Sequence, residues 1–402
     1  MKIRLFISLL LPIVTLLSCA KDEPAPQVLK TSERNLHFSG NGGAWMLTIN
    51  TNTAWQIEGT TDWCSVDKTD GYNTTNLIIS VDANNTGVAR FTNLQISSER
   101  NIVNVSIEQD TVSGSFHYEL PVVFHIIYSD NKDSLQNVKT EVINGIIEKC
   151  NYLFQNPNGS VDMNLHLIAA THDPNGNKLP EPGIDRVQRT NSAYKSSESF
   201  LKETNTVDGD LLWDPNQYVN VFVFTFVESN VSGRTTLPHT PRQNSLPGLL
   251  ANNTFYTRTP DFPWGITLNN TYIYEPDNYQ TMAHELGHYL GLLHVFISKD
   301  NNTDYCNDTY AYDRTEYETY LKNNPELTIQ EKYQRQSIDG ITFTSHNIMD
   351  YYYSYFNQFT ADQFLRVRHV LEHSPLIPGP KDITVTRSLT EETEAPVAIS
   401  IE

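Results

Sequence analysis

The residues with the clearest capacity for chemistry lie in one short run, in the order His284, Glu285, His288, Gly291 and His294. On a helix, positions four apart lie one turn above each other on the same face, so His284 and His288 can direct their imidazoles at one ion. His294 is too far along for a continuing helix to present it there. Gly291 can adopt the left-handed conformation that ends helices and lets the chain turn back. The spacing therefore predicts one zinc ion held by three histidines.

Glu285 decides what such a zinc site would do. Three neutral histidines leave a fourth tetrahedral position for water, which distinguishes a catalytic zinc site from a closed structural one. Zinc lowers the pKa of that water toward about 7, and Glu285, next to the first ligand, can take the proton as a general base. We expect hydrolysis of peptide bonds. The alternative for a bare His-Glu-x-x-His run is a helix with solvated or capped histidines, and the added glycine and third histidine argue against it.

A second stretch, Asn347-Ile348-Met349-Asp350-Tyr351, extends the pattern. The zinc motif is the metzincin signature, and that superfamily has a methionine turn further along the chain. The resemblance implies that Met349 lies beneath the metal as a soft hydrophobic floor. It also implies that Tyr351 approaches the zinc or stabilises developing negative charge. Plain packing within the Tyr351-Tyr352-Tyr353 run is the alternative for Tyr351.

The methionine turn, together with Phe359-Thr360, Gln363 and the opening Pro121–His125, resembles the pappalysin or cytophagalysin family of metzincins over roughly residues 117–378. The resemblance implies an α/β domain with a mixed sheet and an active-site helix. It also implies that the strand at 233–238 pairs with an extended peptide, as in other cases of β-addition.

Two departures from this family stand out. Tyr353-Ser354 replaces the family's second cysteine after the methionine turn, which leaves Cys306 without its expected partner. The segment between Cys306 and His346 is longer and more charged than a minimal member needs, and its role is unassigned. Secreted relatives often hold a structural calcium ion, for which the loop offers candidate carboxylates. These are Asp300, Asp304 and Asp308.

The elements that must position the site follow from hydrophobic periodicity. Strands are expected at 120–128, 163–169 and 218–227, the last apolar enough for burial on both faces. A helix is expected around 143–154, where apolar residues follow the spacing of a core-facing stripe. The zinc motif falls on a helix from about 278 to 290. This alternation predicts an α/β domain.

Residues 28–109 alternate apolar and polar side chains in short runs separated by turn residues, which is typical of a β-sandwich. The motifs Leu36-His37-Phe38, Thr51–Trp55 and Asp62–Val66 resemble the BACON domain, an immunoglobulin-like module. The resemblance implies binding of carbohydrate or mucin. Trp55 and Trp63 could serve that purpose, but we favour core packing for both.

The chain begins like a signal peptide, with Lys2 and Arg4 ahead of an apolar stretch ending at Leu17. The tetrapeptide Leu16-Leu17-Ser18-Cys19 resembles a bacterial lipobox, in which the cysteine is acylated. The charged, proline-rich residues that follow resemble the surface-export signals of lipoproteins from the Bacteroidetes. We therefore expect a lipid anchor at Cys19 in the outer membrane, with the protein facing the cell exterior. An ordinary cleaved signal peptide with a chance cysteine is the alternative.

These patterns predict a multidomain chain. The expected segments are a lipoprotein signal peptide at 1–18, a tether at 19–27, a BACON-like all-β sandwich at 28–109, a linker at 110–117, a metzincin metalloprotease domain at 118–380 and a flexible acidic tail at 381–402. Cys64 and Cys150 are expected to be buried free thiols, although a Cys150–Cys306 disulfide is possible.

Composition narrows the function. The 402 residues include 28 Lys and Arg against 47 Asp and Glu, for a net charge of -19, which disfavours nucleic-acid binding. The favoured function is a surface-anchored zinc endopeptidase acting on proteins or peptides. The alternative is a surface adhesin that binds glycan or mucin and has only a structural zinc site. Glu285 separates the two, because a structural site needs no general base beside its ligand.

Overall fold

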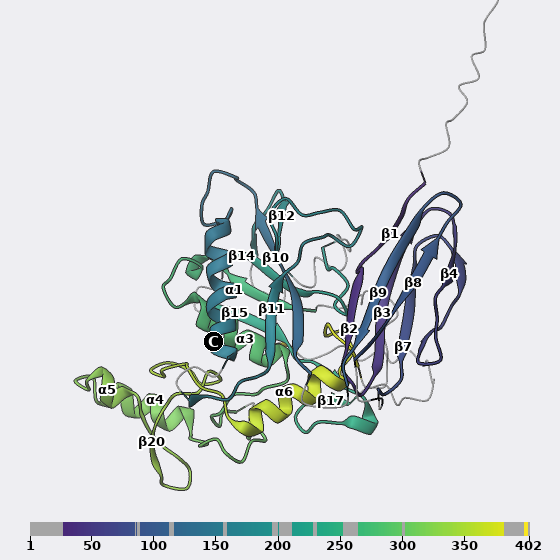
Figure 1. The fold of residues 1–402 in the computed structure, drawn as a ribbon. Helices are drawn as coiled ribbons and strands as arrows, with labels where there is room; N and C mark the ends of the chain where they lie inside the picture. The colour runs from purple at the N-terminus through teal and green to yellow at the C-terminus, as the bar shows by residue number, and fades with distance from the viewer. Residues whose placement is uncertain are drawn as a thin grey trace, which may run out of the picture.

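The computed structural model describes residues 27–84, 86, 89–111, 116–155, 159–194, 200, 211–227, 231–251, 264–299, 302–381 and 398–400. The predicted signal peptide, Cys19 and all but the last residue of the tether lie outside this set. Figure 1 shows a β-sandwich beside a larger part built from both helices and strands. Among the described residues, no helix has the length and apolar character needed to cross a membrane.

The N-terminal part is a sandwich of two sheets with separate strand orders. One sheet has the order β1-β3-β7-β5, with β1 at Leu29–Thr31, β3 at Gly43–Thr51, β7 at Thr75–Val81 and β5 at Cys64–Val66. The other has the order β2-β9-β8-β4-β6, with β2 at Asn35–Phe38, β9 at Ile102–Gln109, β8 at Arg90–Ser97, β4 at Ala54–Glu58 and β6 at Asp70–Tyr72. Alternate side chains of each strand face the other sheet, which is why the sequence alternates.

Trp55 lies in the core of this sandwich, 3% exposed, and its indole donates to the carbonyl oxygen of Asn73 at 3.3 Å. Trp63 packs partly buried at the edge of the same core, under the guanidinium of Arg90. The core interpretation is therefore confirmed for Trp55, which cannot stack on a glycan without leaving the interior.

The larger part is organised around an eight-stranded mixed sheet. Its main order is β11-β10-β14-β18-β15-β21, with β11 at Leu165–Ala169, β10 at Tyr118–Tyr128, β14 at Val219–Phe226, β18 at Ile266–Asn269, β15 at Gly233–Thr236 and β21 at Ala398–Ser400. Strands β12 (Ile184–Gln188) and β13 (Ala193–Tyr194) pair with β10 and β14. The neighbours from β11 to β18 run parallel, whereas β15 is antiparallel to both β18 and β21.

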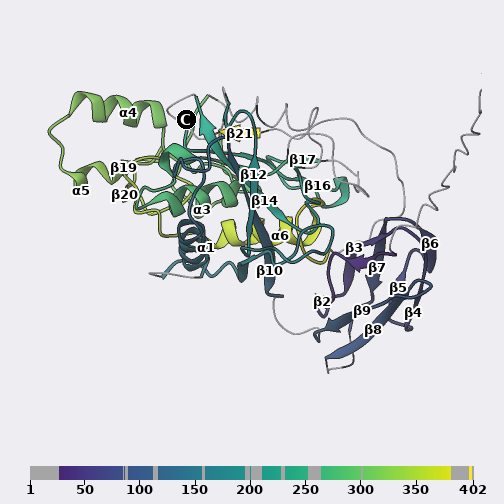
Figure 2. The same cartoon turned by 90° about the horizontal axis from the view of Figure 1, so that it is seen from above.

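Helices α1 (Thr140–Phe154), α3 (Asn278–Tyr289) and α6 (Ala361–His373) lie together beside this sheet (Figure 2). Helix α1 packs on α3 and β11, and α3 packs on β15 and β18. Met282, Ala283 and Leu286 from α3 join one hydrophobic core with the apolar stripe of α1. This packing fixes α3, and therefore the zinc motif, against the antiparallel edge of the sheet.

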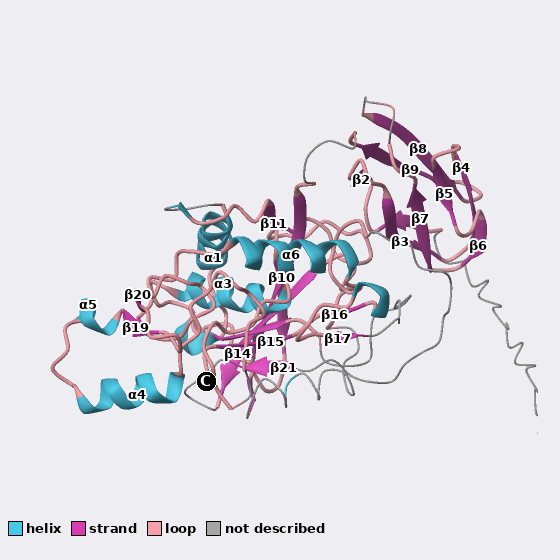
Figure 3. Cartoon of the chain, turned by 90° about the horizontal axis from the view of Figure 1, so that it is seen from below, coloured by secondary structure: helices cyan, strands magenta, loops and turns pink. Residues whose placement is uncertain are grey.

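The long segment after Cys306 forms a projection at the end of the molecule opposite the sandwich (Figure 3). It contains α4 (Arg314–Asn323), α5 (Ile329–Lys332) and a hairpin of β19 (Gln334–Gln336) and β20 (Thr342–Thr344). The remaining short elements lie elsewhere and are β16 (His239–Thr240), β17 (Leu250–Ala251), η2 (Arg242–Asn244) and η3 (Asn270–Tyr272).

The C-terminal segment differs from the predicted flexible tail at both of its described places. Lys381 is 5% exposed and its backbone pairs with Ala44 of the sandwich. Residues 398–400 form β21 on the outer edge of β15. The physical reason is that a sheet edge presents unpaired N–H and C=O groups, which an added strand satisfies. Residues 382–397, 401 and 402 lie outside the described residues.

Candidate metal centre

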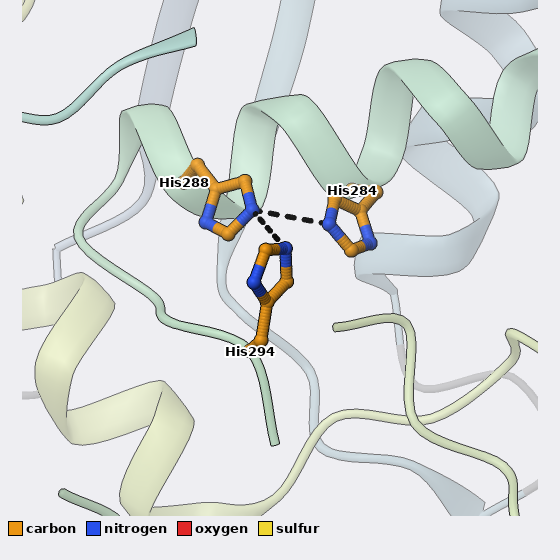
Figure 4. A group of neighbouring side chains, drawn as sticks. All are labelled: His284, His288 and His294. Atoms are coloured by element: carbon orange, nitrogen blue, oxygen red, sulfur yellow. Dashed lines mark hydrogen bonds between the residues drawn. The ribbon is translucent and has the colours of Figure 1, made fainter. Parts of the chain in front are cut away.

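The three predicted ligands converge in the interior. His284 and His288 project from the same face of α3, and His294 reaches the same point from the segment after the helix (Figure 4). Their exposed fractions are 3%, 0% and 9%. Among the described residues, they form the one group of three or more candidate ligands whose donor atoms all lie within 4.8 Å of one another.

The distances between the ring nitrogens suit a shared ion. The Nε2 atom of His288 lies 3.1 Å from that of His284 and 3.0 Å from that of His294. Tetrahedral bonds of about 2.1 Å would separate neighbouring nitrogens by roughly 3.4 Å. The two observed separations are only slightly shorter than this, so a small widening would bring the three rings to tetrahedral geometry.

The opposite ring nitrogens show which atoms are available to a metal. His284 Nδ1 donates to the carbonyl oxygen of Ile348 at 2.7 Å, and His288 Nδ1 donates to that of Leu292 at 2.8 Å. A carbonyl can only accept, so each neutral ring carries its proton on Nδ1 and offers a lone pair at Nε2. Burial lowers the pKa of His284 well below its usual value and that of His288 to about 4. The rings are thus neutral, with lone pairs facing one another, and a cation fits between them.

Gly291 makes the turn that brings His294 back. Its φ is 87°, and its N–H donates to the carbonyl oxygen of His288 while that of Leu292 donates to Gly287. This pair of bonds is the Schellman arrangement that ends a helix at a left-handed residue. A Cβ on Gly291 would also lie 2.6 Å from Val370, so both conformation and space require glycine.

Glu285 is fully buried and points away from the helix face toward β15. Its Oε2 accepts a 2.5 Å hydrogen bond from Thr235, whereas its Oε1 has no hydrogen-bond partner among the residues that the structure describes. Burial raises the pKa of Glu285 to about 8, against the lowering effect of Thr235. A Cβ on Gly233 would lie 2.8 Å from Oε1, so the glycine leaves room for the carboxylate. The sequence did not single out Thr235 or Gly233 as partners of Glu285, because they lie on a strand some fifty positions away.

Met349 lies directly under the helix that carries the histidines and is completely buried. A Cβ on Gly287 would lie 2.4 Å from its Sδ atom, so the sulfur packs where only glycine allows it. Asn347 accepts from the Met349 N–H at 2.8 Å and exchanges amide hydrogen bonds with Gln363 of α6. Met349 thus packs against Gly287 of α3, and its role as a floor beneath the metal stays a prediction.

Tyr351 lies beside the histidines, 5% exposed. Its ring centre is 4.6 Å from that of His294 and 5.6 Å from that of His284. The guanidinium of Arg314 lies 4.6 Å above the same ring. The structure therefore brings every predicted site residue of the zinc motif and the methionine turn to one place.

Two segments of the chain match known protein families. Residues 203–372 match the peptidase family described as pregnancy-associated plasma protein-A, whose members are the pappalysins. Residues 203–372 belong to this metallopeptidase family. Residues 53–110 match the BACON family, described as a putative N-terminal binding domain. The fold is thus a BACON domain followed by an α/β metallopeptidase domain, and the family implies a zinc cofactor.

Several known proteins are similar to parts of the chain. Mature mirolysin of Tannerella forsythia, solved with a cleaved peptide, is 21% identical over 63% of this chain and 92% of its own, with a TM-score of 0.47. A promirolysin variant is 21% identical over 64% and 81%, with a TM-score of 0.45. An uncharacterized protein of Acanthamoeba polyphaga mimivirus is 21% identical over 61% of this chain. The match spans only 27% of that viral protein.

The remaining predictions concern cysteines and calcium. Cys64, Cys150 and Cys306 are free thiols, so the possible Cys150–Cys306 disulfide is not formed. Asp304 accepts hydrogen bonds from the Cys306 N–H and the Thr309 hydroxyl, and Asp308 accepts from the Asp362 N–H. These carboxylates thus shape turns, and Asp300 lies outside the described residues. The calcium site stays a prediction.

Proposed function

We propose that this chain is a zinc-dependent endopeptidase in which His284, His288 and His294 hold the metal and Glu285 is the general base. The observation that carries the proposal is Glu285 Oε1, a buried carboxylate oxygen with no hydrogen-bond partner among the described residues, on the helix that carries two of the three converging imidazoles. When bound, zinc would act as a Lewis acid that polarises a carbonyl and makes water more acidic.

Glu285 would perform the proton transfers. Thr235 holds Oε2 in place, which leaves Oε1 to accept the proton of the attacking water and later to deliver it to the leaving amine. A nearby cation favours the ionised carboxylate and so opposes the effect of burial on its pKa. Tyr351, at the rim of the histidine cluster, would donate to the oxygen on which negative charge develops.

The substrate would bind as an added strand. The outer edge of β15 lies next to Glu285, and residues 398–400 already pair with it in antiparallel register, with Thr235 opposite Ile399. This pairing supports an edge that accepts extended peptide. A peptide in the same place would have to displace β21. The proposed substrates are therefore extended, flexible segments of proteins or free peptides.

The predicted lipid anchor at Cys19 would place the enzyme on the outer face of the bacterial outer membrane. The sandwich would then act as a spacer or hold glycan or mucin near the active site. Incorporation of labelled fatty acid into the wild-type chain but not into Cys19→Ala would test the anchor. Binding of mucin glycans by the full chain would test the sandwich.

The competing function is an adhesin with a structural zinc ion. Structural zinc sites have four protein ligands, whereas the described residues supply a cluster of three. The deciding experiment is cleavage of casein and of a peptide library by the purified chain, with chelation and zinc restoration. We expect cleavage that chelation abolishes and zinc restores. A zinc-loaded, folded chain that cleaves nothing would favour the adhesin.

A further inference from the structure

Among the side chains that the segment between Cys306 and His346 places against the turn after Met349 is a buried arginine. Arg335, on β19, is fully buried. Its Nη1 donates to the carbonyl oxygen of Lys332 at 2.7 Å, which ties the guanidinium to its own hairpin. Its planar face lies 3.8 Å from the ring centre of Tyr317 on α4. Two contacts within its own segment, with Lys332 and Tyr317, therefore fix the position of the guanidinium.

The other nitrogen of Arg335 binds the turn that follows Met349. Its Nη2 lies 3.3, 3.4 and 3.3 Å from the carbonyl oxygens of Tyr351, Tyr352 and Tyr353. The same nitrogen lies 3.6 Å from Oδ2 of Asp350. One guanidinium nitrogen thus contacts four consecutive residues, 350–353, which include Tyr351.

Asp350 completes this arrangement from the other side. It is 1% exposed and accepts from the Tyr312 hydroxyl at 2.5 Å, from the Tyr351 N–H at 2.7 Å and from the Ser345 hydroxyl. A buried carboxylate needs such donors and a countercharge, and Arg335 supplies the countercharge. The N–H and the C=O of Tyr351 are therefore held by opposite members of one ion pair.

The turn would not take this shape unaided. Tyr352 has a φ of 45°, in the left-handed region that side chains other than glycine rarely adopt. Such a conformation costs about 1–3 kcal/mol and persists only where surrounding contacts impose it. Arg335 contacts the carbonyl on each side of Tyr352 as well as its own. With the turn in this shape, the ring centre of Tyr351 lies 4.6 Å from that of His294.

We propose that Arg335 is a positioning residue for Tyr351, so that the long segment between Cys306 and His346 serves the reaction by fixing the turn after Met349. This inference rests on the proposed peptidase function. It assigns no contact with substrate or metal to Arg335. Its effect passes through the backbone of residues 350–353 to the phenol of Tyr351.

The test uses Arg335→Lys, which keeps the charge and loses the planar fork, with Arg368→Lys as the matched control. Arg368 is also buried and donates to a backbone carbonyl, that of Phe116, and its other described partners, Glu372 and the ring of Tyr118, are not residues of the metal centre. Hydrogen exchange of the peptide covering 346–356 should rise at least tenfold in Arg335→Lys and stay unchanged in Arg368→Lys. Equal exchange in both variants would overturn the proposal, whether or not the chain cleaves peptides.

Kinetics then distinguish positioning from simple support of the fold. We expect Arg335→Lys to lower kcat about tenfold with little change in KM, as Tyr351→Phe should. The double variant should be no slower than Tyr351→Phe alone, because both changes remove the same contribution. The inference would be overturned if the loss of kcat in the double variant equalled the product of the two single losses. A change in KM rather than in kcat for Arg335→Lys would overturn it as well. A wild-type chain that cleaves nothing would instead refute the proposed function, and the exchange measurement would still decide the role of Arg335.

Discussion

The two parts of the molecule fill their interiors differently. In the described part of the sandwich, buried polar residues are uncharged and few, namely Thr31, Ser32, Thr51, Asn84 and Gln109. The metallopeptidase part buries Glu285, Arg335 and Asp350 together with the histidines. Apolar interiors need only matching shape, whereas buried charges need partners at fixed distances. The second part is therefore where a small change should alter chemistry rather than stability alone.

The largest contrast is expected from removing a carboxylate in each part. Glu285→Gln should lower kcat/KM by about 10²–10⁴-fold, the usual contribution of a general base. Glu58→Gln, at an exposed position of β4, should leave it unchanged. Both variants should melt within a few degrees of the wild type. Peptide cleavage and calorimetry measure these outcomes, and a Glu285→Gln enzyme with more than a tenth of the original kcat/KM would end the general-base assignment.

Adding one methyl group to a crowded glycine should affect the two parts differently. Gly287→Ala drives a Cβ against Met349, and Gly71→Ala drives one against Trp55 at 2.5 Å. Overpacking of this kind costs about 1–3 kcal/mol, so urea unfolding should show destabilisation in both. Cleavage should fall only in Gly287→Ala, because Met349 must move from beneath the histidines.

Gly145→Ala is the control for this pair. It lies on α1, and apart from its chain neighbours and the backbone of the helix no described atom comes within 4 Å of the added Cβ, so it should stabilise the chain by up to about 1 kcal/mol. Equal loss of cleavage in Gly71→Ala and Gly287→Ala would show that activity merely follows stability.

A smaller effect is expected at Thr235. Thr235→Val removes the hydrogen bond to Glu285 Oε2 and keeps the shape, so kcat should fall by roughly tenfold, as a loss of about 1.4 kcal/mol implies. Thr235→Ser should restore most of it. Thr51→Val, at a buried threonine of the sandwich, should leave kcat unchanged. If Thr235→Val and Thr51→Val behave alike in steady-state cleavage, Thr235 does not orient the base.

The smallest effect is expected from ending the chain after residue 381. Residues 398–400 and an extended peptide would compete for the same edge of β15. Their removal should lower KM by roughly two- to tenfold, the change expected if they cover the edge for half to nine tenths of the time. The value of kcat should stay the same. An unchanged KM for long peptides would mean that β21 does not compete with substrate.

Much of this architecture could be predicted from local patterns. The alternating runs between Trp45 and Ile107 indicate the sandwich because one face of each strand must be apolar. The helix of the zinc motif was expected to end near 290, and α3 ends at Tyr289. The strand at 398–400 was not predicted, because three residues that form an edge strand carry no periodic signal.

The sequence by itself determined which residue types stand together at the proposed site. Histidines four apart on a helix, a glutamate beside the first and a glycine before the third restrict the site to a few geometries, because helix periodicity and a left-handed turn are local properties. Only the tertiary structure decided what holds these groups in place. Thr235 on Glu285, Gly287 on Met349 and Arg335 on the turn of Tyr351 are contacts between segments far apart in the chain. Such contacts depend on how the sheet and helices pack, and no local spacing encodes that packing.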